Sequence, residues 1–91
     1  MVFEWDDEKA QKNLEKHGVS FEEAQTVFAD PLAGIKIDPD HSVGEIREII
    51  VGYSERERLL LVSFTERGEI IRIINARLAT RRERNVYEEK G

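Results

Sequence analysis

Apolar residues in the second half of the chain recur at the two-residue period of β-strands, in segments separated by short polar turns. We predict strands over residues 45–53, 58–65 and 69–76. The stretch from Leu59 to Phe64 is apolar on both faces, so we expect it at the centre of the sheet. Because the connections at 54–57 and 66–68 are short, these strands should be antiparallel neighbours.

The first thirty residues predict two helices. Asp6 and Gly18 are typical cap residues for a helix over residues 7–17. By helical spacing, its inward stripe consists of Ala10, Leu14 and His17. A second helix over residues 20–29 begins with a Ser-x-x-Glu capping box and ends before an Asp-Pro pair.

Two shorter segments complete the predicted sheet. Residues 1–5 alternate, with Phe3 and Trp5 on the buried side. Residues 35–38 alternate weakly, as an edge strand does, and a break at Pro39 follows them.

A basic helix follows the last strand directly. Thr80 with Glu83 is a capping box that predicts a helix over residues 80–87. Its first turn carries Arg81, Arg82 and Arg84. Their charges oppose the helix dipole, so helix stability does not explain them and we expect this turn to bind an anion. The predicted order is β-α-α-β-β-β-β-α, a single α+β domain over residues 1–91 with helices on a curved antiparallel sheet.

The formal net charge is −5, which by itself argues against a nucleic-acid binder. The charge is uneven, however: residues 1–40 carry −6, residues 41–66 carry −2 and residues 67–91 carry +3. This gradient predicts a local basic patch, suited to a polyanion or to an acidic protein partner.

Composition excludes several classes of protein. With no cysteine, neither a disulfide framework nor a thiolate metal site is available. No apolar run approaches membrane-spanning length and the first residues are acidic, unlike a signal peptide, so we expect a cytoplasmic protein without membrane association. No Asp, Glu or His cluster has metal-ligand spacing, and we expect neither a metal nor another cofactor.

Several motifs lie along the whole chain. They are Phe3-x-Trp5-Asp6, Lys16-His17-Gly18-Val19-Ser20-Phe21, Val27-Phe28-x-Asp30-Pro31, Ile71-Arg72-Ile73-Ile74-x-Ala76-Arg77 and Thr80-x-x-Glu83-Arg84-x-x-Tyr87. In this combination the chain resembles the BrnT family of bacterial toxins. Asn75 departs from the Ser expected there, a change that keeps a small polar group. The resemblance implies a ribonuclease toxin with a RelE-like fold. It also implies a BrnA-type antitoxin that covers the active face and carries the domain that binds operator DNA.

RNA cleavage without metal needs a base for the 2′-hydroxyl, a proton donor for the leaving oxygen and cations for the phosphate charge. Arginine suits the last role because its planar fork holds two phosphate oxygens, and histidine suits acid–base work near neutrality. We predict catalytic roles for Arg77, Arg72, Arg84, His17 and Tyr87. We predict RNA binding by Arg47, on the strand over residues 45–53, and by Arg81, Lys16 and His41.

These residues also have structural interpretations. Arg72 is equally suited to a salt bridge with a glutamate across the sheet, and His17 to bonding the last carbonyls of its helix. Tyr87 suits packing of the final helix, Arg81 a solvated or partner-binding position, and His41 an ordinary loop. For the whole chain, the alternative is a non-catalytic protein-binding module that uses the basic strand–helix face.

Overall fold

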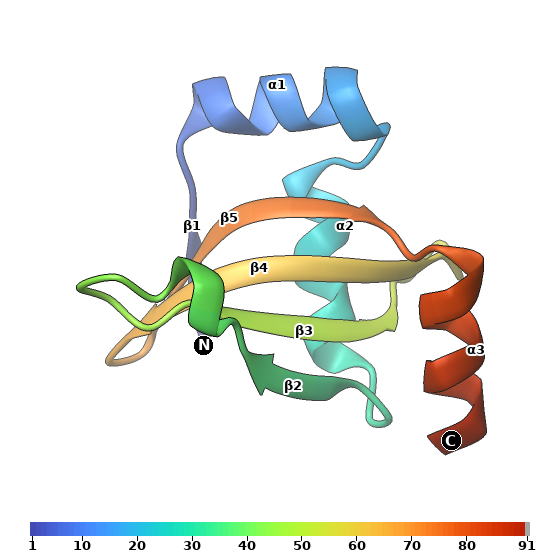
Figure 1. Cartoon of the computed structure of the whole chain (residues 1–91). Coiled ribbons are helices and arrows are strands. Elements are labelled where there is room, and N and C mark those ends of the chain that lie inside the picture. The colour runs from blue at the N-terminus through green and yellow to red at the C-terminus, as the bar shows by residue number, and fades with distance from the viewer. Residues whose placement is uncertain (91) are drawn as a thin grey trace.

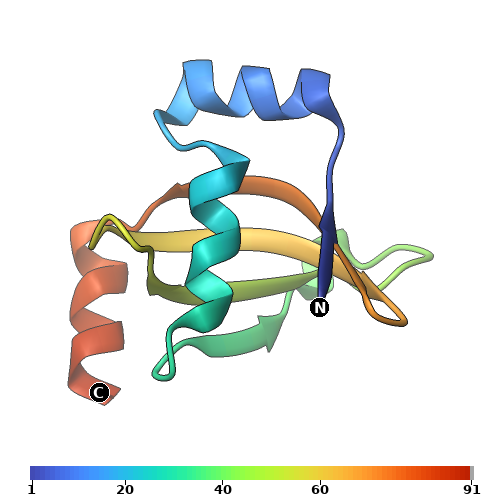
Figure 2. The ribbon, with the colours of Figure 1, turned by 180° about the vertical axis from the view of Figure 1, so that it is seen from behind.

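A five-stranded sheet organises the chain, with α2 across one face, α1 along the β5 edge and α3 beside the strand ends (Figures 1 and 2). The computed structural model describes residues 1–90. Its strands are β1 (Val2–Glu4), β2 (Gly34–Ile37), β3 (Glu48–Tyr53), β4 (Leu59–Arg67) and β5 (Ile70–Leu78). Its helices are α1 (Asp7–His17), α2 (Phe21–Thr26) and α3 (Arg81–Lys90), with 3-10 turns at Val27–Ala29 and Pro39–His41. The predicted α+β order of elements is confirmed.

The strand order is β1-β5-β4-β3-β2, so the apolar β4 is central and β2 is an edge, both as predicted. The prediction of a fully antiparallel sheet is wrong at the other edge, because β1 pairs with β5 in parallel. Short turns determine only the pairing of strands that follow each other in the chain. β1 and β5 lie far apart in the chain and no turn connects them, so the sequence contains no local signal for their pairing.

The core lies between the sheet and α2. Phe21, Ala24 and Val27 from the helical side are fully buried. They form one cluster with residues of the three inner strands, which are Ile50, Leu60, Val62, Phe64, Ile71, Ile73 and Ala76. Phe3 and Trp5 pack against this cluster, as their predicted inward face requires.

The bounds of α1 are as predicted, but its inward residue is Asn13 and not Leu14, which is 43% exposed. The Asn13 side-chain amide donates to the carbonyls of Val19 (2.9 Å) and Ala76 (2.8 Å), and its oxygen accepts from the Ala76 amide (3.1 Å). β5 extends beyond its short partner β1, so Ala76 lacks a neighbouring strand there. Asn13 supplies the missing hydrogen bonds and thereby joins α1 to the edge of β5.

β3 begins at Glu48, three residues later than predicted, so Arg47 lies in the preceding loop and not on a strand. The Ser42 hydroxyl accepts from the Arg47 amide at 3.0 Å, and the Asp38 amide donates to the Arg47 carbonyl at 2.8 Å. These bonds fold residues 38–47 into a compact loop. The Ser42 side chain bonds to backbone groups that would otherwise be free to extend the strand, and hydrophobic periodicity does not reveal such a bond.

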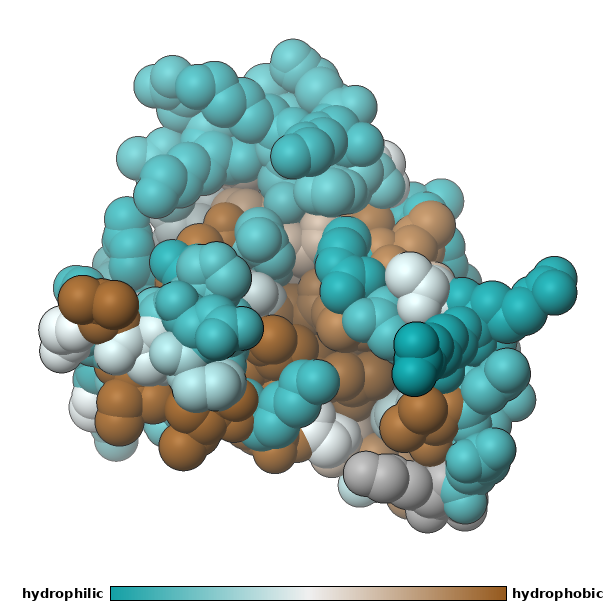
Figure 3. Space-filling model, in the orientation of Figure 1, coloured by the Kyte–Doolittle hydropathy of each residue, from teal (hydrophilic) through white to brown (hydrophobic). Residues whose placement is uncertain are grey.

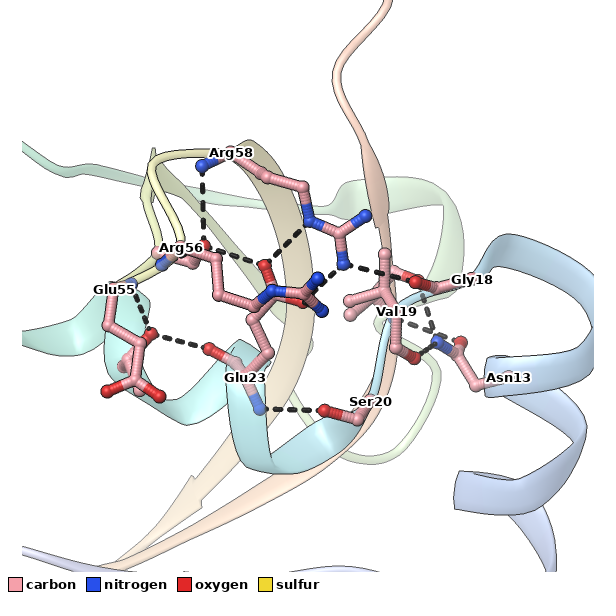
Figure 4. A network of polar contacts seen from close by, with 11 residues as sticks. Asn13, Gly18, Val19, Ser20, Glu23, Glu55, Arg56 and Arg58 are labelled. Atoms are coloured by element: carbon pink, nitrogen blue, oxygen red, sulfur yellow. Dashed lines mark hydrogen bonds and ion pairs between the residues drawn. The ribbon is translucent and has the colours of Figure 1, made fainter.

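A polar network fastens α2 to the turn between β3 and β4 (Figure 4). Glu23 is only 4% exposed and accepts from the Ser54 hydroxyl (2.7 Å) and from Arg58 Nε (2.9 Å) and Nη2. Arg56 Nη1 lies 3.7 Å from Glu23 Oε1, and Arg58 Nη2 also donates to the Gly18 carbonyl at 3.1 Å. The Arg58 hydrogen bonds hold the pKa of Glu23 below its usual value, although burial opposes the shift.

None of the described helices has the length and apolar character that crossing a bilayer requires.

Candidate active site

The sheet face opposite α2 is open, and apolar residues gather at its centre (Figure 3). A groove of about 370 Å³ lies where α3 approaches this face. Val51 and Leu61 form its floor, and β2 residues from Gly34 to Lys36 form one wall. The opposite wall is α3, which contributes Arg82, Glu83, Val86 and Tyr87. The groove therefore combines an apolar floor with charged walls.

Arg77 lies at the end of β5 that leads into α3, and it pairs with Glu83 through two parallel hydrogen bonds. Nη1 and Nη2 each lie 2.8 Å from a carboxylate oxygen of Glu83. The two side chains are 40% and 32% exposed, so the pair is accessible to solvent. The Arg77 hydrogen bonds lower the pKa of Glu83 to about 2, and burial opposes this shift. Glu83 is therefore ionised at neutral pH in the free protein.

Glu83 also caps α3, as the sequence predicts. Its carboxylate accepts from the Thr80 amide at 2.9 Å, and its own amide donates to the Thr80 hydroxyl at 3.1 Å. One carboxylate thus fixes both the start of the helix and the Arg77 guanidinium. The helix start and the candidate arginine form a single unit.

Only one face of α3 reaches the groove. Arg82 and Glu83 lie one turn before Val86 and Tyr87 on that face. Arg81 and Arg84, which the sequence suggested, are exposed and do not line the groove. Glu83 and the β2 residue Lys36 are groove residues missing from the predicted site, and Arg82 was predicted only as part of the anion-binding turn. Helical spacing was the available signal for Arg82 and Glu83, because they lie four positions before Val86 and Tyr87.

Tyr87 anchors α3 to the rest of the domain. Its hydroxyl donates to Asp30 Oδ2 at 3.1 Å, and its ring meets Tyr53 edge to face with centroids 5.8 Å apart. Burial raises the pKa of Tyr87, and the bond to Asp30 adds to that effect. Burial alone would raise the pKa of Asp30 too, but bonds from the Tyr53 and Leu32 amides and from Tyr87 lower it overall. These contacts favour the packing interpretation of Tyr87.

Arg72 and His41 have partners outside the groove. Arg72 lies 3.6 Å from Glu4 on β1, the cross-sheet ion pair that was its structural interpretation. His41 ends the 3-10 turn in the loop over residues 38–47, where Nδ1 lies 2.9 Å from Asp38 Oδ2. The loop also contains Arg47, whose side chain is only partly exposed.

Lys16 and His17 lie at the end of α1. His17 is half-buried and Lys16 is exposed. Gly18 supplies the C-cap with a left-handed backbone (φ 68°), and its amide donates to the Leu14 carbonyl at 2.9 Å. Within residues 1–89, no hydrogen bond or ion pair joins either side chain to Arg77 or α3.

In the part of the chain that the structure describes, no group of three or more His, Asp or Glu side chains is arranged to hold a metal ion.

Comparison with known proteins gives two positive findings. A family model described as the ribonuclease toxin BrnT of type II toxin-antitoxin systems matches residues 5–83. The crystal structure of the Brucella abortus ribonuclease toxin BrnT is similar in fold, with a TM-score of 0.64 and 24% identity. That match covers 89% of this chain and 100% of the Brucella chain. No curated protein gives a sequence match. Since the family model matches most of its length, the chain belongs to the BrnT family of ribonuclease toxins of type II toxin-antitoxin systems.

Proposed function

We propose that this chain is a metal-independent endoribonuclease toxin of RelE-like fold that cleaves RNA by attack of the 2′-hydroxyl on the adjacent phosphate. It acts on cytoplasmic RNA. A BrnA-type antitoxin neutralises it, and the pair contacts operator DNA only through that antitoxin. Membership of a ribonuclease toxin family supports the activity class. The observation that carries the mechanism is the accessible pair of Arg77 and Glu83 beside the groove.

Arg77 binds the scissile phosphate in this proposal. Its guanidinium already holds two oxygens of one anion, both at 2.8 Å, and a phosphate presents the same two-oxygen geometry. The RNA phosphate therefore displaces the Glu83 carboxylate from Arg77. Arg82 and Lys36, on facing walls of the groove, supply further positive charge to the RNA backbone.

Glu83 accepts the proton of the 2′-hydroxyl once Arg77 has moved to the phosphate. Loss of the Arg77 hydrogen bonds removes the largest cause of its low pKa, so its basicity rises when substrate binds. The 2′ oxygen then bonds to phosphorus, the bond from phosphorus to the 5′ oxygen breaks, and solvent protonates the leaving oxygen. The products are a 2′,3′-cyclic phosphate and a 5′-hydroxyl. Arg77 stabilises the charge that develops on the phosphate.

Roles for the remaining residues stay predictions. Arg84 and His17 are retained as candidate catalytic residues, and Arg47, Arg81, Lys16 and His41 as RNA contacts. The Glu4 partner of Arg72 and the Asp30 partner of Tyr87 favour positioning roles for these two side chains.

The test is cleavage of an RNA oligonucleotide in EDTA by wild type and by Arg77→Ala. Loss of a positioned phosphate ligand should lower the rate about 100-fold or more. Arg67→Ala is the matched control. Arg67 also donates two hydrogen bonds to one glutamate, Glu45, but it lies at the end of β4 away from the groove. Equal activity of wild type and Arg77→Ala would overturn the mechanism. Cleavage by neither protein would favour ribosome-dependent action or the binding-module alternative.

A further inference from the structure

The β2 edge presents backbone groups without a strand partner. β2 pairs with β3 on one side only. The Asp38 amide bonds to the Arg47 carbonyl across this ladder. Since antiparallel strands alternate the direction of their peptide groups, those of Lys36 face β3 while those of Ile35 and Ile37 face outwards. β2 is therefore ready to accept another extended chain.

Large aliphatic side chains cluster along the same edge. Ile35 and Ile37 are 57% and 59% exposed. The segments that flank β2 add further exposed residues, which are Leu32, Val43 and Ile46. Natural edge strands are usually shielded by prolines, bulges or several charges, whereas β2 has only Lys36. An exposed aliphatic edge of this kind is typical of a protein-binding surface.

The charges near β2 restrict the nature of the partner. Lys36 on β2 and Arg82 on α3 lie on opposite walls of the groove, at the α3 end of the edge. Within the described residues, neither forms an ion pair. An acidic side chain beside the aliphatic segment would complement both. A second copy of this chain fits poorly, since matching the outward groups of Ile35 with those of Ile37 sets Lys36 opposite Lys36.

We propose that β2 is the docking site of the antitoxin, which adds an extended segment as a sixth strand. Aliphatic side chains of that segment cover Ile35 and Ile37, and an acidic side chain reaches Lys36 and Arg82 at the groove. The added strand follows the wall of the groove that faces Glu83, so it obstructs the entry of RNA. The location rests on the unpaired β2 edge, and the choice of the antitoxin as occupant rests on family membership. Neither depends on the cleavage mechanism.

The first measurement is amide hydrogen exchange of wild-type toxin, alone and in complex with its antitoxin. The Ile35 and Ile37 amides should exchange quickly in the free protein and become at least about 10-fold slower in the complex. Unchanged exchange at both amides would overturn the proposal. This readout needs no variant and no ribonuclease activity, so it is independent of the proposed mechanism.

The second measurement is antitoxin affinity after Ile37→Lys, which places a charge where the partner's aliphatic side chain should pack. Affinity should fall about 10-fold or more, while RNA cleavage stays as in wild type. Val2→Lys is the matched control, because Val2 is 56% exposed on β1 at the opposite edge. Its affinity should stay within about twofold of wild type. Circular dichroism confirms that both variants fold, and undiminished affinity of folded Ile37→Lys would overturn the proposal.

Other occupants of the edge give different results. A toxin dimer that forms without antitoxin and is dissociated by Ile37→Lys, detected by light scattering, would identify a second copy as the occupant. Protection of the two amides by a non-cleavable 2′-deoxy oligonucleotide, but not by the antitoxin, would identify nucleic acid. Either result would overturn the assignment to the antitoxin.

Discussion

Two of the three forked arginine–glutamate pairs in the described residues have similar chemistry and different surroundings. Glu23 with Arg58 joins α2 to a turn 35 residues away, and the Glu23 side chain is 3% exposed. Glu83 and Arg77 lie six residues apart in the chain, and the Glu83 side chain is 32% exposed. The buried pair has further partners in Ser54 and Arg56, whereas the accessible pair lies beside a groove.

This comparison teaches that burial, not residue type, decides whether a pair can exchange its partner. If a buried carboxylate lost its arginine to a ligand, a buried charge would be left without a partner. An accessible pair exchanges its partner at small cost because water screens both groups. We therefore propose that the Glu23 pair serves stability and the Glu83 pair serves chemistry, and the predictions below test that division.

The largest expected effect is on stability at the buried pair. Glu23→Ala leaves Arg58 and Ser54 without their shared acceptor, so the free energy of unfolding should fall by about 3 kcal/mol. Denaturant unfolding followed by circular dichroism measures it. The neighbouring exposed position gives the control, since Glu22→Ala should change stability by less than about 0.5 kcal/mol. Similar effects of the two variants would remove the structural role assigned to Glu23.

Glu83→Gln should lower activity and leave the fold intact, in contrast to Glu23→Ala. The amide oxygen can still cap α3, so the fold should persist, but the base is lost and kcat should fall about 100-fold. Because Arg77 is then no longer paired with a carboxylate, KM should fall as well. Glu88→Gln, an exposed position on the same helix, is the control. A change in KM with unchanged kcat would show that Glu83 only positions Arg77.

Acidification should weaken the Glu83 pair over a defined range. Its pKa is lowered from 4.5 to about 2 in the folded protein, so its stabilising contribution is complete above pH 4.5 and is lost as the pH falls towards 2. After allowance for solvent screening, that contribution should be about 1 kcal/mol. Unfolding free energies of wild type and Arg77→Ala at pH 5, 4 and 3 should therefore converge. Parallel pH curves would contradict the assigned pKa shift.

The smallest expected effect is at Tyr87. Tyr87→Phe removes one hydrogen bond to Asp30 and keeps the ring contact with Tyr53, so stability should fall by about 1 kcal/mol. RNA cleavage should change by less than about threefold if Tyr87 only holds α3 in place. A 100-fold loss of activity at full stability would instead make Tyr87 a proton donor, since general acids contribute about that much.

The sequence alone was sufficient for features determined by local interactions. Asp6 and Gly18 delimit α1, Thr80 and Glu83 begin α3, and the apolar run of β4 marks the centre of the sheet. Caps and periodicities depend on residues within one turn or one strand, so they can be recognised in the sequence alone. The family motifs, read as a whole, also indicated the toxin family.

The tertiary structure decided what depends on residues distant in sequence. It pairs β1 with β5, buries Asn13 in place of Leu14, and forms an ion pair between Arg72 and Glu4. It also selects the face of α3 that meets the groove, which places Arg82 and Glu83 in the candidate site and leaves Arg81 and Arg84 outside it. A side chain's role here depends on its burial and on which charge folding places next to it. Both are properties of the packed domain, and no local pattern in the chain specifies them.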